Sequence, residues 1–290
     1  MATLKHRRPE NVTGDFYVDS SCIDCDTCRW MAPSVFREEG EQSAVYHQPI
    51  DARERELALQ ALLSCPTGSI GTIEKPIDIT KVQADFPLNI EDNVYDCGYH
   101  SESSFGATSY LIQHPSGNIL IDSPRFTPPL VKRLEGMGGI RWMYLTHRDD
   151  VADHARFHEY FGCDRILHED DITTDTRDVE IKLTGEEAIE FLPDARIIPV
   201  PGHSKGHTVL LYRDKFLFTG DDLAWSDDSG QIIAFRNYCW YSWSELVRSN
   251  RKLLNYRWEW LLPGHGRRFH ASAERMREEF QKCLAWMETV

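Results

Sequence analysis

Three cysteines spaced three residues apart constrain this chain more than any other feature. Cys22, Cys25 and Cys28 lie within seven residues, and Cys65 follows after a further 36 residues, directly before Pro66. A loop with this spacing wraps three corners of an iron–sulfur cubane and leaves the fourth corner to a distant thiolate. Zinc bound by four thiolates is the alternative, but zinc ribbons normally use two separated C-x2-C pairs. The spacing therefore predicts one 4Fe–4S cluster with these four cysteines as ligands.

A short helix is predicted between the third and the fourth cysteine. Asp51 can cap it, Glu54 stands three residues later, and leucines at positions 59, 62 and 63 form an apolar stripe. Pro66 ends this helix and presents Cys65 at its end.

These residues resemble the single-cluster bacterial-type ferredoxins. The cysteine loop is followed by Pro33-Ser34-Val35-Phe36, and Cys65 opens a Cys-Pro-x-Gly segment, as in that family. The resemblance covers residues 16–73 and implies a small ferredoxin-like domain. Two-cluster relatives carry a cysteine where this chain has Met31-Ala32 before the proline, so the resemblance implies a single cluster.

Charge and hydropathy restrict the partners and the compartment. The chain has 46 acidic and 32 basic residues and a net charge of −14, which disfavours nucleic acid as a partner. No apolar run approaches the roughly 18 residues that cross a bilayer. The basic start of the chain also lacks the apolar stretch of a secretory signal. We expect a cytoplasmic protein with no membrane partner, a small-molecule substrate and, as a further option, a redox partner protein.

The domain boundary is expected near residue 75, which gives a ferredoxin-like domain at 1–75 and a second domain at 76–290. Between 71 and 89 the chain holds two prolines and mixed polar residues, so this segment is either a linker or a strand laid against the second domain.

Histidines and aspartates follow several predicted strands of the second domain. A β-hairpin is predicted from Ser109 to Asp122, and the later apolar runs each end in a turn and a metal-binding residue type. Such strand ends meet in one crevice of an α/β fold. The segments concerned are Thr146-His147, Pro201-Gly202-His203-Ser204-Lys205-Gly206-His207, Thr219-Gly220-Asp221 and Pro263-Gly264-His265-Gly266. Imidazole and carboxylate ligands together suit zinc, iron or manganese.

The four motifs resemble those of the metallo-β-lactamase superfamily, including the glyoxalase II-like hydrolases, over residues 90–290. The resemblance implies an α+β chain in which an αββα sandwich follows the ferredoxin-like domain. It also implies one or two divalent metal ions. By carry-over, His203 is a ligand of the first metal, Asp221 bridges the two, His265 binds the second, and His207 orients its loop.

The first motif departs from the family pattern His-x-His-x-Asp-His and leaves two registers open. His147 and Asp149 are ligand candidates in both. Asp153 and His154 are ligands only in the first register, which we favour because it keeps an Asp-His pair. Asp150 is a ligand only in the second. In either register a carboxylate replaces an imidazole, which shifts the preference from zinc toward iron or manganese.

Other side chains have structural roles in this interpretation. His100 is expected to be a surface or hydrogen-bonded residue, and the aromatic segment Phe235 to Trp243 is expected to pack in the core rather than line a substrate pocket. Four cysteines outside the cluster motif are expected to be buried free thiols: Cys97, Cys163, Cys239 and Cys283. Amphipathic helices are predicted over 243–254 and 271–287.

Three functions are compatible with these motifs. The first is a metal-dependent hydrolase of ester-, thioester- or lactone-like substrates, in which Asp153 or Asp149 orients and deprotonates the attacking water. The second is a flavodiiron-like oxidoreductase, whose diiron site would receive electrons from the 4Fe–4S cluster. The third is a non-catalytic electron-transfer or binding module. We favour the hydrolase.

Overall fold

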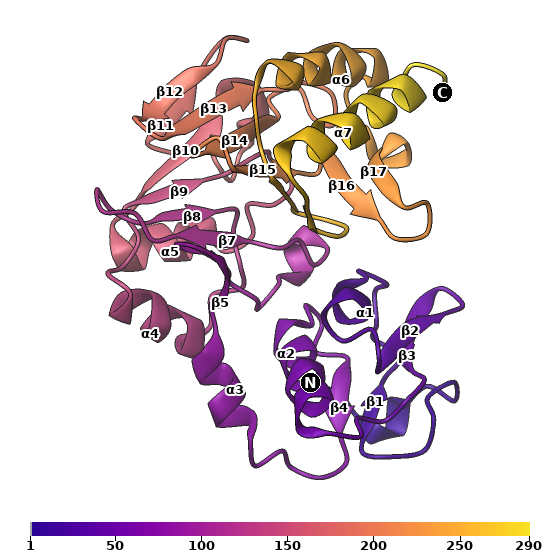
Figure 1. Cartoon of the computed structure of the whole chain (residues 1–290). Coiled ribbons are helices and arrows are strands. Elements are labelled where there is room, and N and C mark those ends of the chain that lie inside the picture. Colours follow the sequence, from indigo (N-terminus) through magenta and orange to yellow (C-terminus); the bar gives the residue numbers. More distant parts are fainter. Residues whose placement is uncertain (1) are drawn as a thin grey trace. The chain divides into compact units, whose positions relative to one another are not determined.

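A computed structural model describes residues 2–290, and Figure 1 traces the chain from end to end. Contacts divide the chain into two compact units. The first contains the residues up to Arg141 and the segment Ala155–Gly162. The second contains Trp142–His154 and Cys163–Val290. The boundary expected near residue 75 lies inside the first unit and stays a prediction. No helix within residues 2–290 is long and apolar enough to span a membrane.

The amino-terminal part of the first unit is built from two small antiparallel strand pairs and two helices. Strand β1 (Phe16–Val18) pairs with β4 (Ile70–Thr72), and β2 (Phe36–Glu39) pairs with β3 (Gln42–Val45). Helix α1 (Thr27–Met31) carries the third cysteine of the motif, and α2 (Ala52–Ser64) ends directly before the fourth. The predicted cap of α2 is confirmed, because the side chain of Asp51 accepts a hydrogen bond from the Glu54 N–H at 2.8 Å.

The rest of the first unit holds four antiparallel strands in the order β8-β7-β6-β5. The predicted hairpin is confirmed as the pair β7–β8. The segment 71–89 contains a helix, α3, which neither of the two expectations for this segment anticipated. The elements are α3 (Ile79–Asp85), β5 (Leu88–Glu91), β6 (Val94–Asp96), β7 (Tyr110–Ile112), β8 (Ile119–Ile121), α4 (Pro128–Gly136) and α5 (His154–Phe161).

The second unit contains a three-stranded parallel arrangement, β9-β10-β11, and a six-stranded sheet in the order β12-β13-β14-β15-β18-β19. Its strands are β9 (Trp142–Tyr144), β10 (Asp164–His168), β11 (Ile181–Leu183), β12 (Ile189–Leu192), β13 (Ala195–Pro199), β14 (Thr208–Tyr212), β15 (Phe216–Gly220), β18 (Trp260–Pro263) and β19 (Phe269–His270). A separate hairpin joins β16 (Leu223–Ser226) to β17 (Gln231–Ala234).

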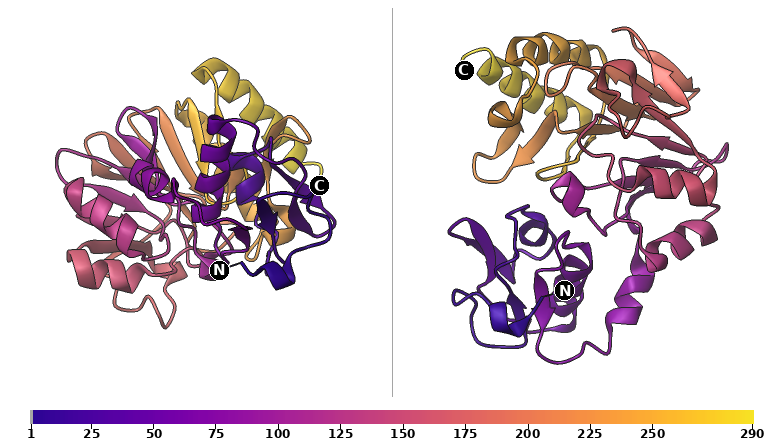
Figure 2. Two further views of the ribbon diagram at one scale, coloured as in Figure 1. Left: turned by 90° about the horizontal axis from the view of Figure 1, so that it is seen from below. Right: turned by 180° about the vertical axis from the view of Figure 1, so that it is seen from behind.

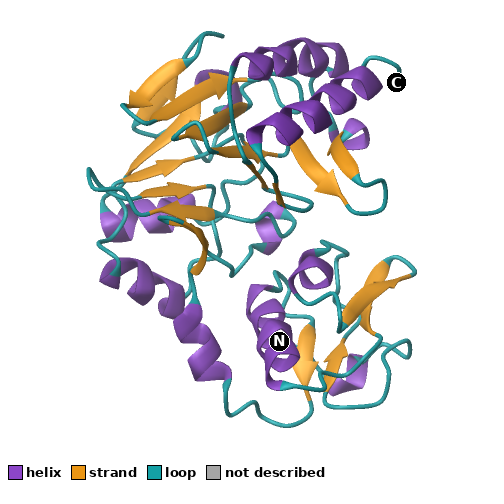
Figure 3. Ribbon diagram, viewed as in Figure 1, coloured by secondary structure: helices purple, strands orange, loops and turns teal. Residues whose placement is uncertain are grey.

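Two helices cover one face of the six-stranded sheet, as Figures 1 and 2 show. Helix α6 (Trp243–Asn250) is extended by a short 3₁₀ turn, and α7 (Ala273–Met287) is the last element (Figure 3). Both predicted amphipathic helices are thus confirmed. Their apolar faces share one buried cluster with strand residues such as Val209, Leu217 and Leu261. Burial of this apolar surface is what holds the helices on the sheet. A sheet covered by helices on one face agrees with the predicted αββα class.

The register of this sheet brings three loops to one edge. Strand β15 runs parallel to β18, with Gly220 opposite Pro263, so Asp221 and His265 follow at the same end of the sheet. Strand β13 ends at Pro199 and leads into the loop that carries His203. Parallel strand ends collect loops in this way in α/β folds, and the predicted ligand motifs are therefore neighbours in space.

Candidate metal centre and iron–sulfur site

The four cysteines of the amino-terminal motif line one cavity in the first unit. Its other lining residues include the apolar Val18, Ile23 and Ile70. Backbone N–H groups are aimed at two of the sulfurs: that of Ser69 donates to Cys65 Sγ at 3.2 Å, and that of Ser43 donates to Cys22 Sγ at 3.5 Å.

Burial raises the pKa of the Cys25 thiol to about 11 and also raises that of Cys28. Such buried thiols lose their protons when they bind a metal, and N–H donors then stabilise the resulting thiolates. The pocket thus fits a cluster held by four thiolates.

A buried histidine approaches this pocket through a threonine. Thr27 Oγ1 lies 3.4 Å from Cys25 Sγ and 3.0 Å from His100 Nδ1. His100 is fully buried, and its ring stacks on Trp30 at 6.3 Å between centroids. A Cβ atom at Gly106 would lie 3.0 Å from Cys25 Sγ. Of the two options expected for His100, a surface or a hydrogen-bonded residue, this position fits the second, and Gly106 of the same segment lies against Cys25.

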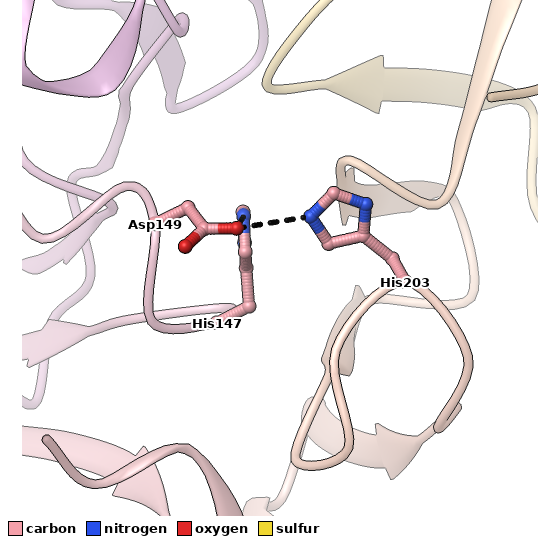
Figure 4. Close-up of side chains that lie close together, drawn as sticks. All are labelled: His147, Asp149 and His203. Atoms are coloured by element: carbon pink, nitrogen blue, oxygen red, sulfur yellow. Dashed lines mark hydrogen bonds and ion pairs between the residues drawn. The ribbon is translucent and has the colours of Figure 1, made fainter. Parts of the chain in front are cut away.

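Five of the seven predicted metal ligands of the second unit meet at the strand ends described above, namely His147, Asp149, His203, Asp221 and His265. His147, Asp149 and His203 form one group whose ligand atoms all lie within 4.8 Å of one another (Figure 4). The Nε2 of His203 is 3.3 Å from Asp149 Oδ2, and the Nε2 of His147 is 3.9 Å from the same oxygen. The groups come from two loops that are more than 50 residues apart in the sequence, since the Asp149–His203 separation is 54 residues.

Asp150 and Asp221 form a second group with the same histidine, His147. The Nε2 of His147 is 3.6 Å from Asp221 Oδ2, and His265 Nδ1 is 2.7 Å from Asp221 Oδ1. Asp221 Oδ2 also lies 3.9 Å from His203 Nε2 of the first group, so Asp221 lies against both groups, as expected of a bridging ligand. At Gly264 a Cβ would lie 2.9 Å from both Asp150 Oδ2 and Asp221 Oδ1, so glycine is needed for this close approach.

The structure favours the second register of the first motif. Within residues 2–290, the possible ligand groups contain Asp149 and Asp150 but neither Asp153 nor His154. His154 instead lies at the start of α5 and is buried, with its Nδ1 at 3.2 Å from a guanidinium nitrogen of Arg165. Asp150, a candidate in the second register alone, therefore joins the proposed ligands, and the assignment of Asp153 and His154 remains a prediction without geometric support.

The electrostatics of the site suit a cation. Burial lowers the pKa of His147, which keeps its imidazole neutral and able to coordinate. Burial alone would raise the pKa of Asp221, but the neighbouring imidazoles, His265 first, lower it and keep the carboxylate ionised. The buried Nε2 of His147 and Nδ1 of His203 make no hydrogen bond within residues 2–290. Neutral imidazoles and ionised carboxylates with open lone pairs are a donor set that fits divalent metal.

Asp171 is a site residue that the sequence did not point to. Its carboxylate accepts hydrogen bonds from the backbone N–H of Arg148 at 3.1 Å, from the N–H of Gly206 at 2.7 Å and from the hydroxyl of Ser204. It therefore ties the His147 loop to the His203 loop. The one available signal was its place after β10, at another strand end of the same edge.

The aromatic segment from Phe235 to Trp243 corrects one expectation. We expected core packing, but Tyr238, Trp240 and Tyr241 are exposed. The segment is a 3₁₀ turn, Arg236–Tyr238, followed by an irregular stretch, and it lacks the periodicity that buries alternate side chains. Of the four cysteines expected to be buried free thiols, Cys97, Cys163 and Cys283 are buried and free, whereas Cys239 is free but half-buried.

Comparison with known proteins gives a family match for the amino-terminal part of the chain and structural matches for most of the chain. Residues 18–72 match the family described as the 4Fe-4S single cluster domain of Ferredoxin I. A search of curated proteins gave no match.

Among solved structures, VMB-1 is 18% identical over 69% of this chain and 95% of its own, with a TM-score of 0.54. The metallo-β-lactamase DIM-1 exposed to ceftazidime is 15% identical over 69% of this chain and 95% of its own, with a TM-score of 0.55. A metallo-β-lactamase from Pontibacter korlensis is 14% identical over 70% of this chain and 98% of its own, with a TM-score of 0.52.

The chain joins a single-cluster ferredoxin domain to a metallo-β-lactamase fold. At these identities the second likeness concerns the fold alone. The family that residues 18–72 match is one of 4Fe-4S single cluster domains, and the second part contains groups that could hold a metal ion. The four cysteines and the His–Asp groups described above are the residues that we propose as their ligands.

Proposed function

We propose that the metallo-β-lactamase-fold part is a metal-dependent hydrolase of ester-, thioester- or lactone-like small molecules. The observation that carries this proposal is the pair of ligand groups that share His147, with Asp221 of the second group 3.9 Å from His203 of the first. Imidazole and carboxylate groups gathered around one buried histidine are typical of the metal sites of hydrolases. The names of the similar structures, which are those of metallo-β-lactamases, point to the same class of reaction.

When bound, divalent ions polarise a substrate carbonyl and lower the pKa of a coordinated water. His147 is fully buried, whereas the side chain of Asp149 is 43% exposed, so the site is open on the Asp149 side. Asp149 is hydrogen bonded to His203, which fixes the orientation of its carboxylate. It is therefore the best-placed carboxylate to hold the attacking water and take up its proton. Asp153, the other sequence candidate for this role, lies outside both groups.

The ligand set also bears on the metal. Asp149, Asp150 and Asp221 contribute three carboxylates to the two groups. Carboxylates are hard ligands, and they favour iron or manganese over zinc. We therefore expect iron or manganese to support a higher activity than zinc.

A flavodiiron-like oxidoreductase is the second candidate, and one observation favours it. Asp149 lies beside His147 and His203, and in the first register of the motif it takes the place of the second histidine, where flavodiiron-like proteins use a carboxylate. The 4Fe–4S domain on the same chain would be the electron donor. Two irons in the second unit, together with oxygen-dependent reoxidation and no hydrolysis, would favour this reaction.

The test counts iron, zinc, manganese and labile sulfide per chain after anaerobic purification and then measures hydrolysis of phenyl acetate. The hydrolase predicts about four cluster irons and four sulfides together with one or two further divalent ions. It also predicts that His203→Ala abolishes turnover, whereas His47→Ala, a change at an exposed histidine, leaves turnover unchanged.

Turnover that is insensitive to His203→Ala would contradict the hydrolase. About six irons with four sulfides, no turnover, and fast reoxidation of the reduced protein by oxygen that requires His203 would instead support the oxidoreductase.

A further inference from the structure

Exposed aromatic side chains gather on the segment 235–241 of the second unit. Tyr238, Trp240 and Tyr241 are 59%, 57% and 48% exposed. Within residues 2–290, Trp240 is the one tryptophan among the exposed large apolar side chains. Large aromatic side chains left in water forgo the free energy of burial, and a cluster of them marks a binding surface.

One end of this segment is fixed to the loop of a proposed metal ligand. The backbone N–H groups of Trp240 and Tyr241 both donate to the carbonyl of His203, at 2.9 and 3.1 Å. The Trp240 ring lies 6.4 Å from the His203 ring at an interplanar angle of 63°. The Tyr238 ring meets the Trp240 ring edge-on, 6.0 Å away at 78°. These contacts hold the aromatic rings beside the centre.

The other end of the segment reaches the loop of a second proposed ligand. A Cβ at Gly266 would lie 3.2 Å from Phe235 Cζ, and Gly266 directly follows His265. The segment therefore runs along the metal centre from the His265 loop to the His203 loop. A ligand that lies on its exposed rings would place a neighbouring functional group at the metals.

We propose that Tyr238, Trp240 and Tyr241 form an aromatic platform that binds a planar aromatic group of the substrate, next to the carbonyl that reacts. This inference rests on the proposed hydrolase function and names its substrate class: aryl or arylmethyl esters and thioesters, or lactones fused to an aromatic ring. Rigid rings suit such a platform, because offset-stacked and edge-to-face contacts add to the free energy of burial. A small molecule is the fitting occupant because both ends of the segment 235–241 contact loops that carry proposed metal ligands.

The experiment measures the binding of 2-naphthoate and of acetate to the full, metal-loaded chain by equilibrium dialysis. Both probes offer a carboxylate to the metals, and one of them adds a planar ring. We expect 2-naphthoate to bind at least about tenfold more tightly than acetate, and Trp240→Ala to remove most of this preference. Trp240→Phe should keep most of it. Tyr160→Ala, a change at an aromatic residue that is 52% exposed but lies outside the segment, should leave it unchanged.

Turnover of 2-naphthyl acetate and of ethyl acetate by the same variants separates this inference from the proposed function. A naphthoate preference that depends on Trp240, without turnover of either ester, would support the platform and contradict the hydrolase. Turnover of ethyl acetate with equal naphthoate affinity in the wild type and Trp240→Ala would overturn the platform and leave the hydrolase standing. No naphthoate preference and no turnover would overturn both.

Discussion

At the scale of single residues, the candidate metal centre is defined by three carboxylates that lie close to one buried imidazole. Asp149, Asp150 and Asp221 each bring an oxygen near His147. Carboxylates that are close together repel one another most strongly where water is excluded, so their proximity is stable when a cation lies between them. Metal binding should therefore raise the thermal stability of the second unit, since a ligand that binds the folded state alone stabilises it.

Asp150 and Asp153 provide a direct test of the register of the first motif. We expect Asp150→Asn to weaken metal binding in the second unit by on the order of 100-fold, because it removes a ligand beside Asp221. Asp153→Asn should retain the metal content of the wild type. Metal analysis after dialysis against a weak chelator measures both effects. The reverse pattern, with metal lost from the Asp153 variant, would show that the Asp-His pair is the ligand set after all.

Thr27 should tune the iron–sulfur cluster. Its hydroxyl lies 3.4 Å from Cys25 Sγ and can donate a hydrogen bond once this sulfur is a thiolate. Hydrogen bonds to cluster sulfurs stabilise the reduced, more negative cluster, so Thr27→Val should lower the midpoint potential by on the order of tens of millivolts. Thr80→Val, at an exposed threonine of α3, is the control. Redox titration followed by EPR measures the potential, and equal potentials in the two variants would rule out this role.

At the scale of elements, the end of β15 depends on a glycine. Gly220 has φ +51°, and a Cβ there would lie 2.5 Å from Thr146 Oγ1 and 2.8 Å from His207 Nε2. Gly220→Ala should lower the free energy of unfolding by about 3 kcal/mol through backbone strain and overpacking. Gly230 has φ +62° with nothing within 4 Å, so Gly230→Ala isolates the strain and should cost about 1 kcal/mol. Urea unfolding measures both, and equal losses would refute the packing argument.

A second element-scale prediction concerns the pair that joins β10 to the residue before β11. Arg165 donates to both carboxylate oxygens of Glu180, at 3.0 and 2.7 Å. Partial burial raises the pKa of Glu180, but the hydrogen bonds from Arg165 outweigh it and lower this pKa to about 2. The unfolded carboxyl titrates near its ordinary value of about 4.3, so the ionised pair stabilises the fold above that pH. This stabilisation is lost as the pH falls from about 4.3 toward 2.

Glu180→Gln should therefore cost about 1–2 kcal/mol at pH 7, a value that allows for solvent screening of a partly exposed pair. The difference between this variant and the wild type should shrink below about pH 4. Glu187→Gln, at an exposed glutamate, should change stability little at any pH. Urea unfolding between pH 3 and 7 tests this. A stability difference that does not depend on pH would mean that Glu180→Gln destabilises the protein through altered packing rather than through the lost charge.

Much of this element pattern was predictable from the sequence, because short-range rules determine it. The cap of α2 and the β7–β8 hairpin depend on residues a few positions apart, and the ligands that follow β13, β15 and β18 depend on family motifs. The register of the first motif was not predictable, because the stretch between β9 and α5 can be aligned in two ways. Asp171 could not be found because its partners Arg148 and Ser204 are 23 and 33 residues away. The exposure of Trp240 could not be predicted, because an irregular loop has no periodic hydropathy pattern that separates exposed from buried side chains.

At the scale of the whole molecule, the two cofactor sites draw on separate parts of the chain. Cys22, Cys25, Cys28 and Cys65 all belong to the first unit. The residues of the two candidate metal groups, and His265 beside Asp221, all belong to the second. Because neither site borrows a ligand from the other unit, each should form without the other.

Cys65→Ser should abolish the visible absorbance and the labile sulfide of the cluster and keep the divalent-metal content of the second unit. His203→Ala should do the opposite, with an intact cluster spectrum and at least on the order of 100-fold weaker binding of the divalent metal. Iron, sulfide and metal analysis of anaerobically purified variants measures both contents, and His47→Ala serves as the common control. If Cys65→Ser also empties the second unit, assembly of the metal centre requires the folded ferredoxin domain, and the two sites are coupled through the fold rather than through shared ligands.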